Sequence, residues 1–324
     1  MRRYLAGFLT AMSLCAPSMA ADSYPSRTIT LVAGFAPGGT TDTLARLLAN
    51  GLTKEMGQTV VVENISGAGG LIGMQHLLKS DPDGYTLLFI NTSLAILPHL
   101  HPKAGFDPLR DVDPVGIVAD VPMVLSVSNK SGIKSLPDLL ARMKSKPMEV
   151  NFGSAGAGST AHLAEALFLH LSKTQAELIS YRGSGPALAD LMSGQVDGVI
   201  DQTVTMLPLD KDNRIKAIAV TGEKRLSQAP HLPTFIEGGV PEFDLSIWNG
   251  VVAPKGTPPA VIEKLNQAMS AVIDSDEFKQ RLDQLAAQAP GEDGRGAGPM
   301  RAQVVRDVER IGELVKEAGM YSQH

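Results

Sequence analysis

Apolar positions along the chain follow two periodicities, and each change of period marks a predicted element. The β-branched run Thr28–Gly34 predicts a strand, and Thr41–Met56 carries four leucines at helical spacing. Thr59–Glu63 is the next apolar run. Two near-continuous apolar strands on either side of an amphipathic helix predict a parallel pair joined by a right-handed crossover.

The same alternation continues to about residue 90 and then changes. A helix near Gly70–Lys79 and a strand at Tyr85–Ile90 extend the first block. Further on, Val115–Val118 and Met123–Val127 are two strand-like runs separated by a short polar break that includes Pro122. This pattern predicts that the chain crosses there from one sheet to another.

A second alternating block and a helical C-terminal part follow. The predicted strands are Glu149–Phe152, Glu177–Tyr181, Val196–Asp201, Lys216–Thr221 and Leu245–Ala253. The predicted helices are Thr160–Leu171, Pro186–Met192, Pro258–Gln288 and Ala302–Lys316, with a glycine-rich linker at Asp293–Met300. We predict two α/β lobes with a ligand cleft between them: lobe 1 at 21–121 plus 249–324 and lobe 2 at 122–248.

The first twenty residues predict an export signal. Arg2 and Arg3 form a short positive region, Tyr4–Leu14 is apolar, and Ser18–Ala20 has the small-x-small pattern of a cleavage site. We expect removal of signal peptide 1–20 and a periplasmic location. A membrane anchor is less favoured because the apolar run is well short of the roughly 20 residues that a spanning helix needs.

Composition and charge narrow the function classes. The chain has 324 residues, of which 44% are apolar and 5% aromatic, and a net charge of −5. These values exclude a disordered or fibrous protein and argue against nucleic acid as the partner. Cleavage would leave 304 residues (324 − 20) with a charge of −7 (−5 − 2) and no cysteine, because the single one is Cys15. Disulfides, thiolate metal sites and cysteine nucleophiles are then excluded, and lipidation of Cys15 is disfavoured by the preceding Leu14.

Two glycine-rich turns follow strands and open helices, one in each predicted lobe. The first is Phe35–Asp42 (FAPGGTTD) and the second is Gly153–Thr160 (GSAGAGST). Backbone N–H groups in such turns are available to an anion at the positive end of a helix dipole, and the missing Cβ atoms allow close approach. Together the turns predict a clamp for a carboxylate that needs no Arg or Lys. The alternative is that the glycines only permit tight packing.

Other chemistries have weaker support. Gly156–Ala161 fits the loose G-x-G-x-x-A dinucleotide pattern, but Tyr181 and Arg182 stand where that pattern needs an acid. The chain contains no G-x-S-x-G and no H-E-x-x-H. We therefore expect no cofactor and no enzyme activity.

Three histidines need separate interpretation. His99 and His101 have a spacing that can chelate a metal, but they fall in a predicted Pro-flanked loop and are interpreted as surface residues. We expect no metal. His162 lies in the first turn of the helix after the second glycine-rich turn, and both a structural role and a place near the ligand stay open.

A series of short segments, in a fixed order from Tyr24 to the last helix, carries a family resemblance. These segments are Phe35–Asp42, Gly57–Asn64, Gly67–Gly70, Pro82–Leu87, Phe106–Val115, Ser154–Leu163, Tyr181–Gly183, Gly194–Asp197, Pro233–Pro241 and Trp248–Pro258. On them the chain resembles the Bug (Bordetella uptake gene) family, the extracytoplasmic solute-binding receptors of tripartite tricarboxylate transporters. Gly34, Arg182 and Asn249 depart from the family pattern, where Pro, Lys and an aromatic residue are usual.

The resemblance implies a type II periplasmic-binding-protein fold, in which two α/β lobes joined by two strands close on a small carboxylate. It also implies that both turns hold the proximal carboxylate through backbone N–H groups, often with bridging waters, and that further positions near the cleft contact the distal end. The predicted ligand-binding residues are Phe35, Ala36, Pro37, Gly38, Gly39, Thr40, Asp42, Thr92, Ser93, Ser154, Ala155, Gly156, Ala157, Gly158, Ser159, His162, Tyr181, Arg182 and Asp201.

We therefore expect a monomeric periplasmic receptor for a small organic carboxylate, a di- or tricarboxylate or a related acid. It would deliver this ligand to the membrane permease subunits of a tripartite tricarboxylate transporter. The scarcity of aromatic residues favours an aliphatic acid. Two alternatives stay open: the loaded protein docks on a membrane sensor kinase, or the chain is a secreted enzyme that uses Ser or His in the cleft.

Overall fold

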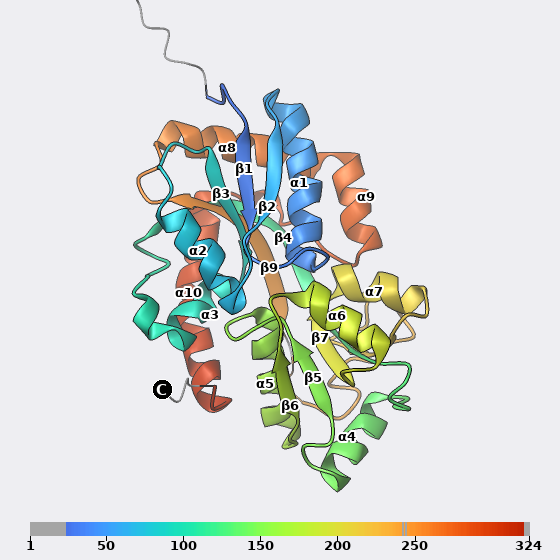
Figure 1. The fold of residues 1–324 in the computed structure, drawn as a ribbon. Coiled ribbons are helices and arrows are strands. Elements are labelled where there is room, and N and C mark those ends of the chain that lie inside the picture. Colours follow the sequence, from blue (N-terminus) through green and yellow to red (C-terminus); the bar gives the residue numbers. More distant parts are fainter. Residues whose placement is uncertain (1–23, 242, 244, 321–324) are drawn as a thin grey trace, which may run out of the picture.

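The computed structural model describes residues 24–241, 243 and 245–320, so the predicted signal peptide 1–20 lies outside the described residues. Figure 1 shows two groups of strands and helices, one above the other. We call the elements around the first sheet lobe 1 and those around the second sheet lobe 2. The lobe boundaries at 121/122 and 248/249 stay a prediction.

Lobe 1 is built on a sheet of order β2-β1-β3-β9-β4. Its strands are β1 (Ile29–Ala33), β2 (Val60–Asn64), β3 (Thr86–Asn91), β4 (Val112–Val127) and β9 (Ser246–Pro254). β1 pairs in parallel with β2 and β3, which confirms the predicted parallel pair, whereas β9 runs antiparallel to β3 and β4.

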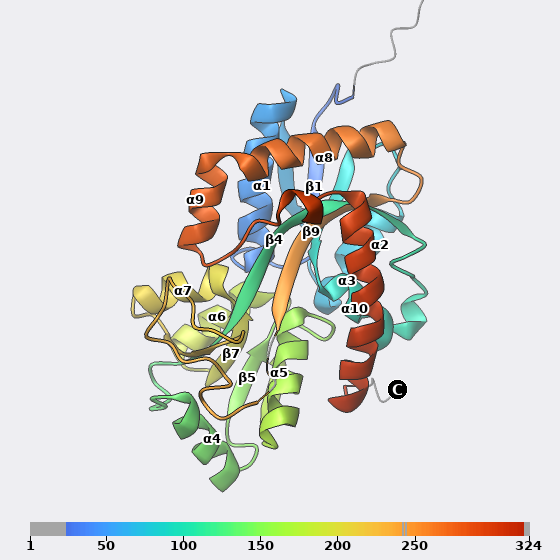
Figure 2. The same ribbon diagram turned by 180° about the vertical axis from the view of Figure 1, so that it is seen from behind.

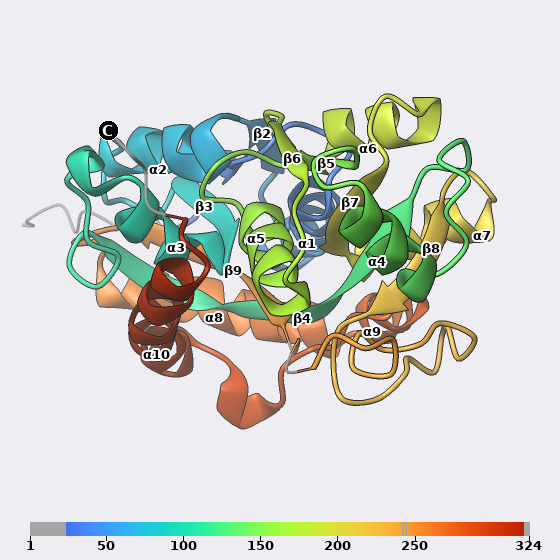
Figure 3. The same cartoon turned by 90° about the horizontal axis from the view of Figure 1, so that it is seen from below.

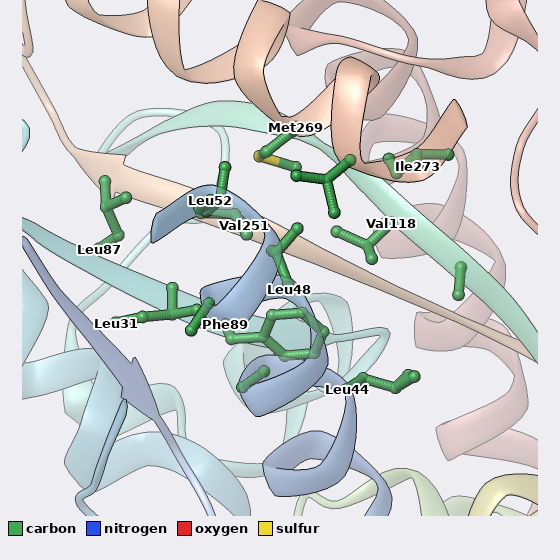
Figure 4. Close-up of a cluster of buried hydrophobic side chains, with 14 of the residues drawn as sticks. Leu31, Leu44, Leu48, Leu52, Leu87, Phe89, Val118, Val251, Met269 and Ile273 are labelled. Atoms are coloured by element: carbon green, nitrogen blue, oxygen red, sulfur yellow. The ribbon is translucent and has the colours of Figure 1, made fainter. Parts of the chain in front are cut away.

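Helices on both sides bury this sheet. They are α1 (Thr40–Met56), α2 (Leu71–Leu78), α3 (Ser93–Leu100), α8 (Pro259–Asp274), α9 (Asp276–Gln284) and α10 (Ala297–Glu317). The close-up in Figure 4 shows Leu44, Leu48 and Leu52 of α1. They pack between the sheet, for example Phe89 of β3, and α8, for example Met269. The leucine stripe that predicted α1 is therefore the face that packs into the core.

Lobe 2 is built on β4, β7 (Gly198–Gln202), β5 (Asn151–Ser154) and β6 (Glu177–Ser180), with β8 (Lys216–Val220) on the other side of β4. Its helices are α4 (Leu136–Ser145), α5 (Thr160–Ser172), α6 (Ser184–Ser193) and α7 (Thr203–Lys211). A cluster of Phe152, Phe168, Phe235 and Phe243 forms part of its core.

One strand serves both sheets. Residues Val112–Pro122 of β4 pair with β9, whereas Met123–Val127 pair with β7 and β8. The chain does change sheets near Pro122, as predicted, but the two predicted strands are one continuous strand. Figure 2 shows β4 and β9 running from one lobe into the other, with α10 alongside both lobes. From below, α10 and α5 lie next to each other (Figure 3), and Leu163 of α5 shares a buried cluster with Ile311 and Val315 of α10.

The sequence predicted no helix at α4 or α7, and it was wrong at three further places. Pro258–Gln288 is not one helix, because Ser275 ends α8 and its hydroxyl accepts a hydrogen bond from the Phe278 N–H that opens α9. The glycine-rich stretch before the last helix already belongs to α10 from Ala297. His99 lies in α3, not in a loop, and its Nε2 is 2.8 Å from the Val308 carbonyl oxygen of α10.

None of the helices formed by the described residues combines the length and apolar character needed to cross a membrane.

The phenylalanine cluster of lobe 2 yields a stability prediction. The Phe168 ring is fully buried, with ring centroids 6.0 Å from Phe152, 5.7 Å from Phe235 and 6.4 Å from Phe243. Phe168→Ala should lower the free energy of unfolding by about 3–5 kcal/mol, because it leaves a cavity among rings that cannot collapse fully. Urea unfolding followed by circular dichroism measures the loss.

Val305→Ala is the matched control, since Val305 is 48% exposed on α10. It should change the unfolding free energy by no more than about 0.5 kcal/mol. Equal stability of the two variants would contradict the assigned core.

Candidate functional site

A pocket lies between the lobes where the two glycine-rich turns meet, and we call it the interlobe pocket. Its lining residues are Phe35, Gly39, Thr40, Thr41 and Asn91 from lobe 1 and Ala155, Ser159, Thr160, Ser184, Asp201 and Gln202 from lobe 2. None of these residues is Lys, Arg or His, and Asp201 is the one acid among them. A wider surface hollow between α7 and α9 is lined by other residues, including Asp210 and Arg281, and contains neither turn.

The first turn is held in shape by Asp42. Its carboxylate accepts hydrogen bonds from the Gly38 N–H (3.1 Å) and from Asn64 Nδ2 (2.9 Å), and it pairs with Arg46 at 2.8 Å. Burial alone would raise the pKa of Asp42, but the hydrogen bonds from Arg46, Asn64 and Gly38 hold it below its ordinary value. Asp42 therefore stays ionised, and its hydrogen bonds fix the conformation of the turn.

The N-terminus of α1 faces the pocket without a side-chain cap. The N-cap residue is Gly39, which has no side chain that could cap the helix. The first N–H groups of a helix have no partner within the helix, so those after Gly39 remain available to a ligand. Two donors expected in this turn are in use: the Gly38 N–H by Asp42, and the Ala36 N–H by the Arg182 carbonyl oxygen of lobe 2 at 3.2 Å.

The second turn has a different local design. Ser159 caps α5, because its hydroxyl accepts from the His162 N–H at 3.1 Å. Gly156 has φ +107°, and a Cβ atom there would lie 2.9 Å from the Tyr181 carbonyl oxygen. His162 Nδ1 accepts from the Gly158 N–H at 3.5 Å, and burial followed by the nearby His101 lowers its pKa. A neutral His162 thus supports the turn and is not among the residues that line the pocket.

Glycines let the two lobes approach backbone to backbone beside the pocket. A Cβ atom on Gly185 would overlap the Pro37 carbonyl oxygen, and one on Gly69 would overlap the Ala157 carbonyl oxygen. The hydroxyl oxygens of Thr40 and Thr205 are 3.4 Å apart across the same interface. Bulkier residues at these points would hold the lobes apart.

Several buried oxygen atoms have no hydrogen-bond partner among the described residues. They include the hydroxyls of Thr92, Ser93 and Ser154, both carboxyl oxygens of Glu165 and Oδ2 of Asp201. Burial raises the pKa of Asp201 to about 6 and that of Glu165 well above its ordinary value. Unpaired buried polar atoms are unfavourable, so this region is suited to a polar ligand or bound water.

The structure brings six predicted site residues to the pocket wall: Phe35, Gly39, Thr40, Ala155, Ser159 and Asp201. Tyr181 is turned elsewhere, since its hydroxyl donates to Asp190 at 2.6 Å, and burial and this hydrogen bond raise its pKa to about 12. Arg182 is exposed. Roles in ligand binding for these and the other predicted residues stay a prediction.

Sequence reasoning missed five lining residues: Thr41, Asn91, Thr160, Ser184 and Gln202. Thr41 and Thr160 belong to the two predicted turns, Phe35–Asp42 and Gly153–Thr160, but were not among the predicted ligand-binding residues. Asn91 and Gln202 are the last residues of β3 and β7, and ligands of open α/β sheets bind at carboxyl ends of strands, so this rule would have found them. The described residues contain no group of three or more His, Cys, Asp or Glu placed to hold a metal ion.

Comparisons with known proteins point in one direction. A family model described as tripartite tricarboxylate transporter family receptor matches residues 44–320. The protein BugT of Bordetella pertussis is 38% identical over 321 residues, which cover 96% of this chain and 95% of BugT.

Three solved structures are similar over most of their length. The periplasmic binding protein BugD has a TM-score of 0.89 and 34% identity, covering 93% of this chain and 100% of that one. Rpa4515 of R. palustris with adipate has a TM-score of 0.87 and 35% identity, covering 91% and 98%. MatC of Rhodopseudomonas palustris with bound malate has a TM-score of 0.87 and 32% identity, covering 90% and 100%.

The contacts of Asp42 yield a pH-dependent prediction. Asp42→Ala should lower the free energy of unfolding at neutral pH by about 1–3 kcal/mol, because three charge-assisted contacts are lost. The pKa of Asp42 is lower in the folded state, so its stabilising contribution is present above about pH 4 and disappears as pH falls through the folded-state pKa. Urea unfolding across this pH range should show the difference from wild type shrinking on acidification.

Asp81→Ala is the control, because Asp81 is exposed. It should leave the unfolding free energy nearly unchanged at every pH. A pH-independent effect of Asp42→Ala would contradict the assigned role of its charge.

Proposed function

The chain belongs to the tripartite tricarboxylate transporter receptor family and is a periplasmic solute-binding receptor, and from this premise we propose that it binds a small aliphatic dicarboxylate in the interlobe pocket. We further propose that it delivers this ligand to the membrane permease subunits of a tripartite tricarboxylate transporter.

Family membership confirms two of the predictions made from the sequence and removes one alternative. The resemblance to Bug proteins and the periplasmic-binding-protein fold are confirmed. The family and the structural neighbours are receptors and not enzymes, so the secreted-enzyme alternative is dropped.

The observation that carries the ligand proposal is the meeting of two helix N-termini at one pocket. The first turns of α1 and α5 both line it, through Thr40 and Thr41 and through Ser159 and Thr160. Backbone N–H groups and hydroxyls at a helix start favour an anion without any cationic side chain. The neighbours with adipate and malate support a dicarboxylate, and Phe35 as the one aromatic lining residue offers little stacking surface for a flat ring.

Delivery to a permease is favoured over docking on a sensor kinase because the matched family is one of transporter receptors. Co-purification of membrane partners with the ligand-loaded protein distinguishes the two. Capture of a kinase without any permease subunit would favour the signalling alternative.

The ligand proposal is tested by thermal denaturation with a panel of aliphatic dicarboxylates, tricarboxylates, amino acids and aromatic acids. A bound ligand at 100 times its Kd stabilises by about 2.7 kcal/mol, which raises Tm by several degrees in a chain of this size. We expect the largest shift with an aliphatic dicarboxylate. No shift with any carboxylate would contradict the proposal.

Lobe contact at the pocket is tested by Gly185→Ala. The added methyl group would overlap the Pro37 carbonyl oxygen and should weaken binding of the best panel ligand at least about tenfold, because the lobes can no longer close on it. Isothermal titration calorimetry measures the change.

Gly298→Ala is the matched control. Each of these glycines is the second residue of a helix and precedes a proline, but no atom lies within 4 Å of a Cβ placed on Gly298. The control should bind like wild type. Equal affinities for all three proteins would rule out the Gly185–Pro37 contact as part of the ligand-bound form.

A further inference from the structure

Two acids are buried together on the lobe 2 side of the interlobe pocket. Asp201, at the end of β7, lines the pocket and is 2% exposed, and Glu165 of α5 is fully buried. Asp201 Oδ1 accepts from the Gln202 N–H at 2.7 Å, whereas its Oδ2 makes no hydrogen bond of ordinary geometry among the described residues, although the Ser184 hydroxyl lies near enough to lower the pKa of Asp201. Burial raises the pKa of Glu165, the Ile200 N–H and the Ser154 hydroxyl oppose that rise, and the charge of Asp201 adds to it.

The segments packed around Asp201 bring few charges to it. Val124 of β4 is its pairing partner, β5 contributes Phe152–Ser154, and α7 begins with Thr203–Thr205. All of these residues are uncharged, and the lining residue Ser184 at the start of α6 is uncharged as well.

The elements around Asp201 carry these titratable and charged groups: His162, Glu165 and His170 on α5, Asp42, Arg46, Lys54 and Glu55 on α1, Arg182 ahead of α6 and Asp190 on it, Asp210 and Lys211 on α7, and Asp113 and Asp120 on β4. Arg182 is exposed, and the hydrogen bonds of Asp42 keep it ionised. Burial raises the pKa of Glu165 and lowers that of His162, so it favours the neutral form of both. Burial also raises the pKa of Asp201, to about 6, so this pocket-lining acid can change charge close to neutral pH.

A bound carboxylate places a second acceptor beside Asp201. An ionised carboxylate accepts hydrogen bonds but donates none, so two of them cannot bond to each other unless one carries a proton. When two carboxyl groups share one site, the charge of one strongly raises the pKa of the other, so one of them keeps its proton.

We propose that Asp201, backed by Glu165, binds the ligand as a neutral acid, so that capture of a carboxylate anion in the interlobe pocket takes up one proton from solvent. The Oδ2 hydroxyl then donates to a ligand carboxylate oxygen and satisfies an atom that otherwise has no partner. This inference rests on the proposed function, because it needs an anionic ligand in the pocket.

The proposal fixes how affinity depends on pH. Above about pH 6 the free protein must gain a proton to bind, so the affinity for a permanent dianion should fall up to about tenfold per pH unit. Below about pH 5 Asp201 is already protonated, so proton uptake should approach zero.

Isothermal titration calorimetry in two buffers of different ionisation enthalpy measures the proton number directly. The probes are succinate, L-malate and adipate, together with L-aspartate, which differs from L-malate by an ammonium in place of a hydroxyl. At about pH 7.5 wild type should take up about 0.5–1 proton per bound dicarboxylate.

Three variants locate the proton. Asp201→Asn, a permanently neutral isostere, should still bind the dicarboxylate, with proton uptake near zero and an affinity that varies little with pH. Glu165→Gln should keep the uptake, because the proposal assigns the proton to Asp201 and burial favours the neutral form of Glu165. Glu177→Gln removes an exposed carboxylate of lobe 2 and should match wild type in affinity and proton number.

The failures of the two proposals are distinguishable. Dicarboxylate binding by wild type with no proton uptake would overturn the neutral-acid role of Asp201 and leave the proposed function standing. A preference for L-aspartate over L-malate without uptake would overturn it too, because Asp201 would then act as an ionised partner of the ammonium. No binding of any carboxylate would contradict the proposed function and this inference with it.

Discussion

The ladder between β4 and β9 is the constraint on which the rest of the architecture depends. β4 pairs with β9 from Val112 to Pro122 and then continues as a central strand of the second sheet from Met123. β4 is a strand of both sheets. The position of one sheet relative to the other is therefore set by main-chain hydrogen bonds and not by side-chain packing alone. Trp248 of β9 anchors this ladder to lobe 1, since its indole Nε1 donates to the buried Asp307 of α10 at 2.6 Å.

This arrangement places main-chain donors at a pocket whose lining contains no cationic side chain. β1 and β5 each end in a glycine-rich turn and a helix start, and the shared strand brings the two ends face to face. A buried Arg or Lys would carry a large desolvation penalty whenever no anion is bound, whereas helix N-termini are only partial charges. In the proposed binding mode, main-chain donors hold the anion without burying a cation in the free form.

Sequence reasoning recovered the α/β alternation, because buried strands and amphipathic helices leave distinct periodicities. It missed α3, α4 and α7, each of which contains a proline. Leu94–Leu97 of α3 are all buried, so this helix shows no polar face and no readable period. The two turns were predicted because glycine, strand and helix signals coincide there. Ser184 was not, because only the meeting of the lobes makes it a neighbour of Gly39 in the first turn.

Two kinds of group surround the pocket: main-chain groups of the two turns and polar side chains. The main chain of the turns is fixed by contacts that do not involve the ligand, such as those of Asp42 with Gly38 and Asn64, so substitutions elsewhere in the pocket leave it in place. The side chains of Asn91, Ser184, Asp201 and Gln202 come instead from strand ends and a helix start. Two of them also support the scaffold, because Asn91 accepts from the Ser93 N–H and Gln202 accepts from Asn249 of β9. In the proposed binding mode, the main-chain groups of the turns hold one carboxylate and these side chains face whatever lies beyond it, so the side chains would determine which acid is bound.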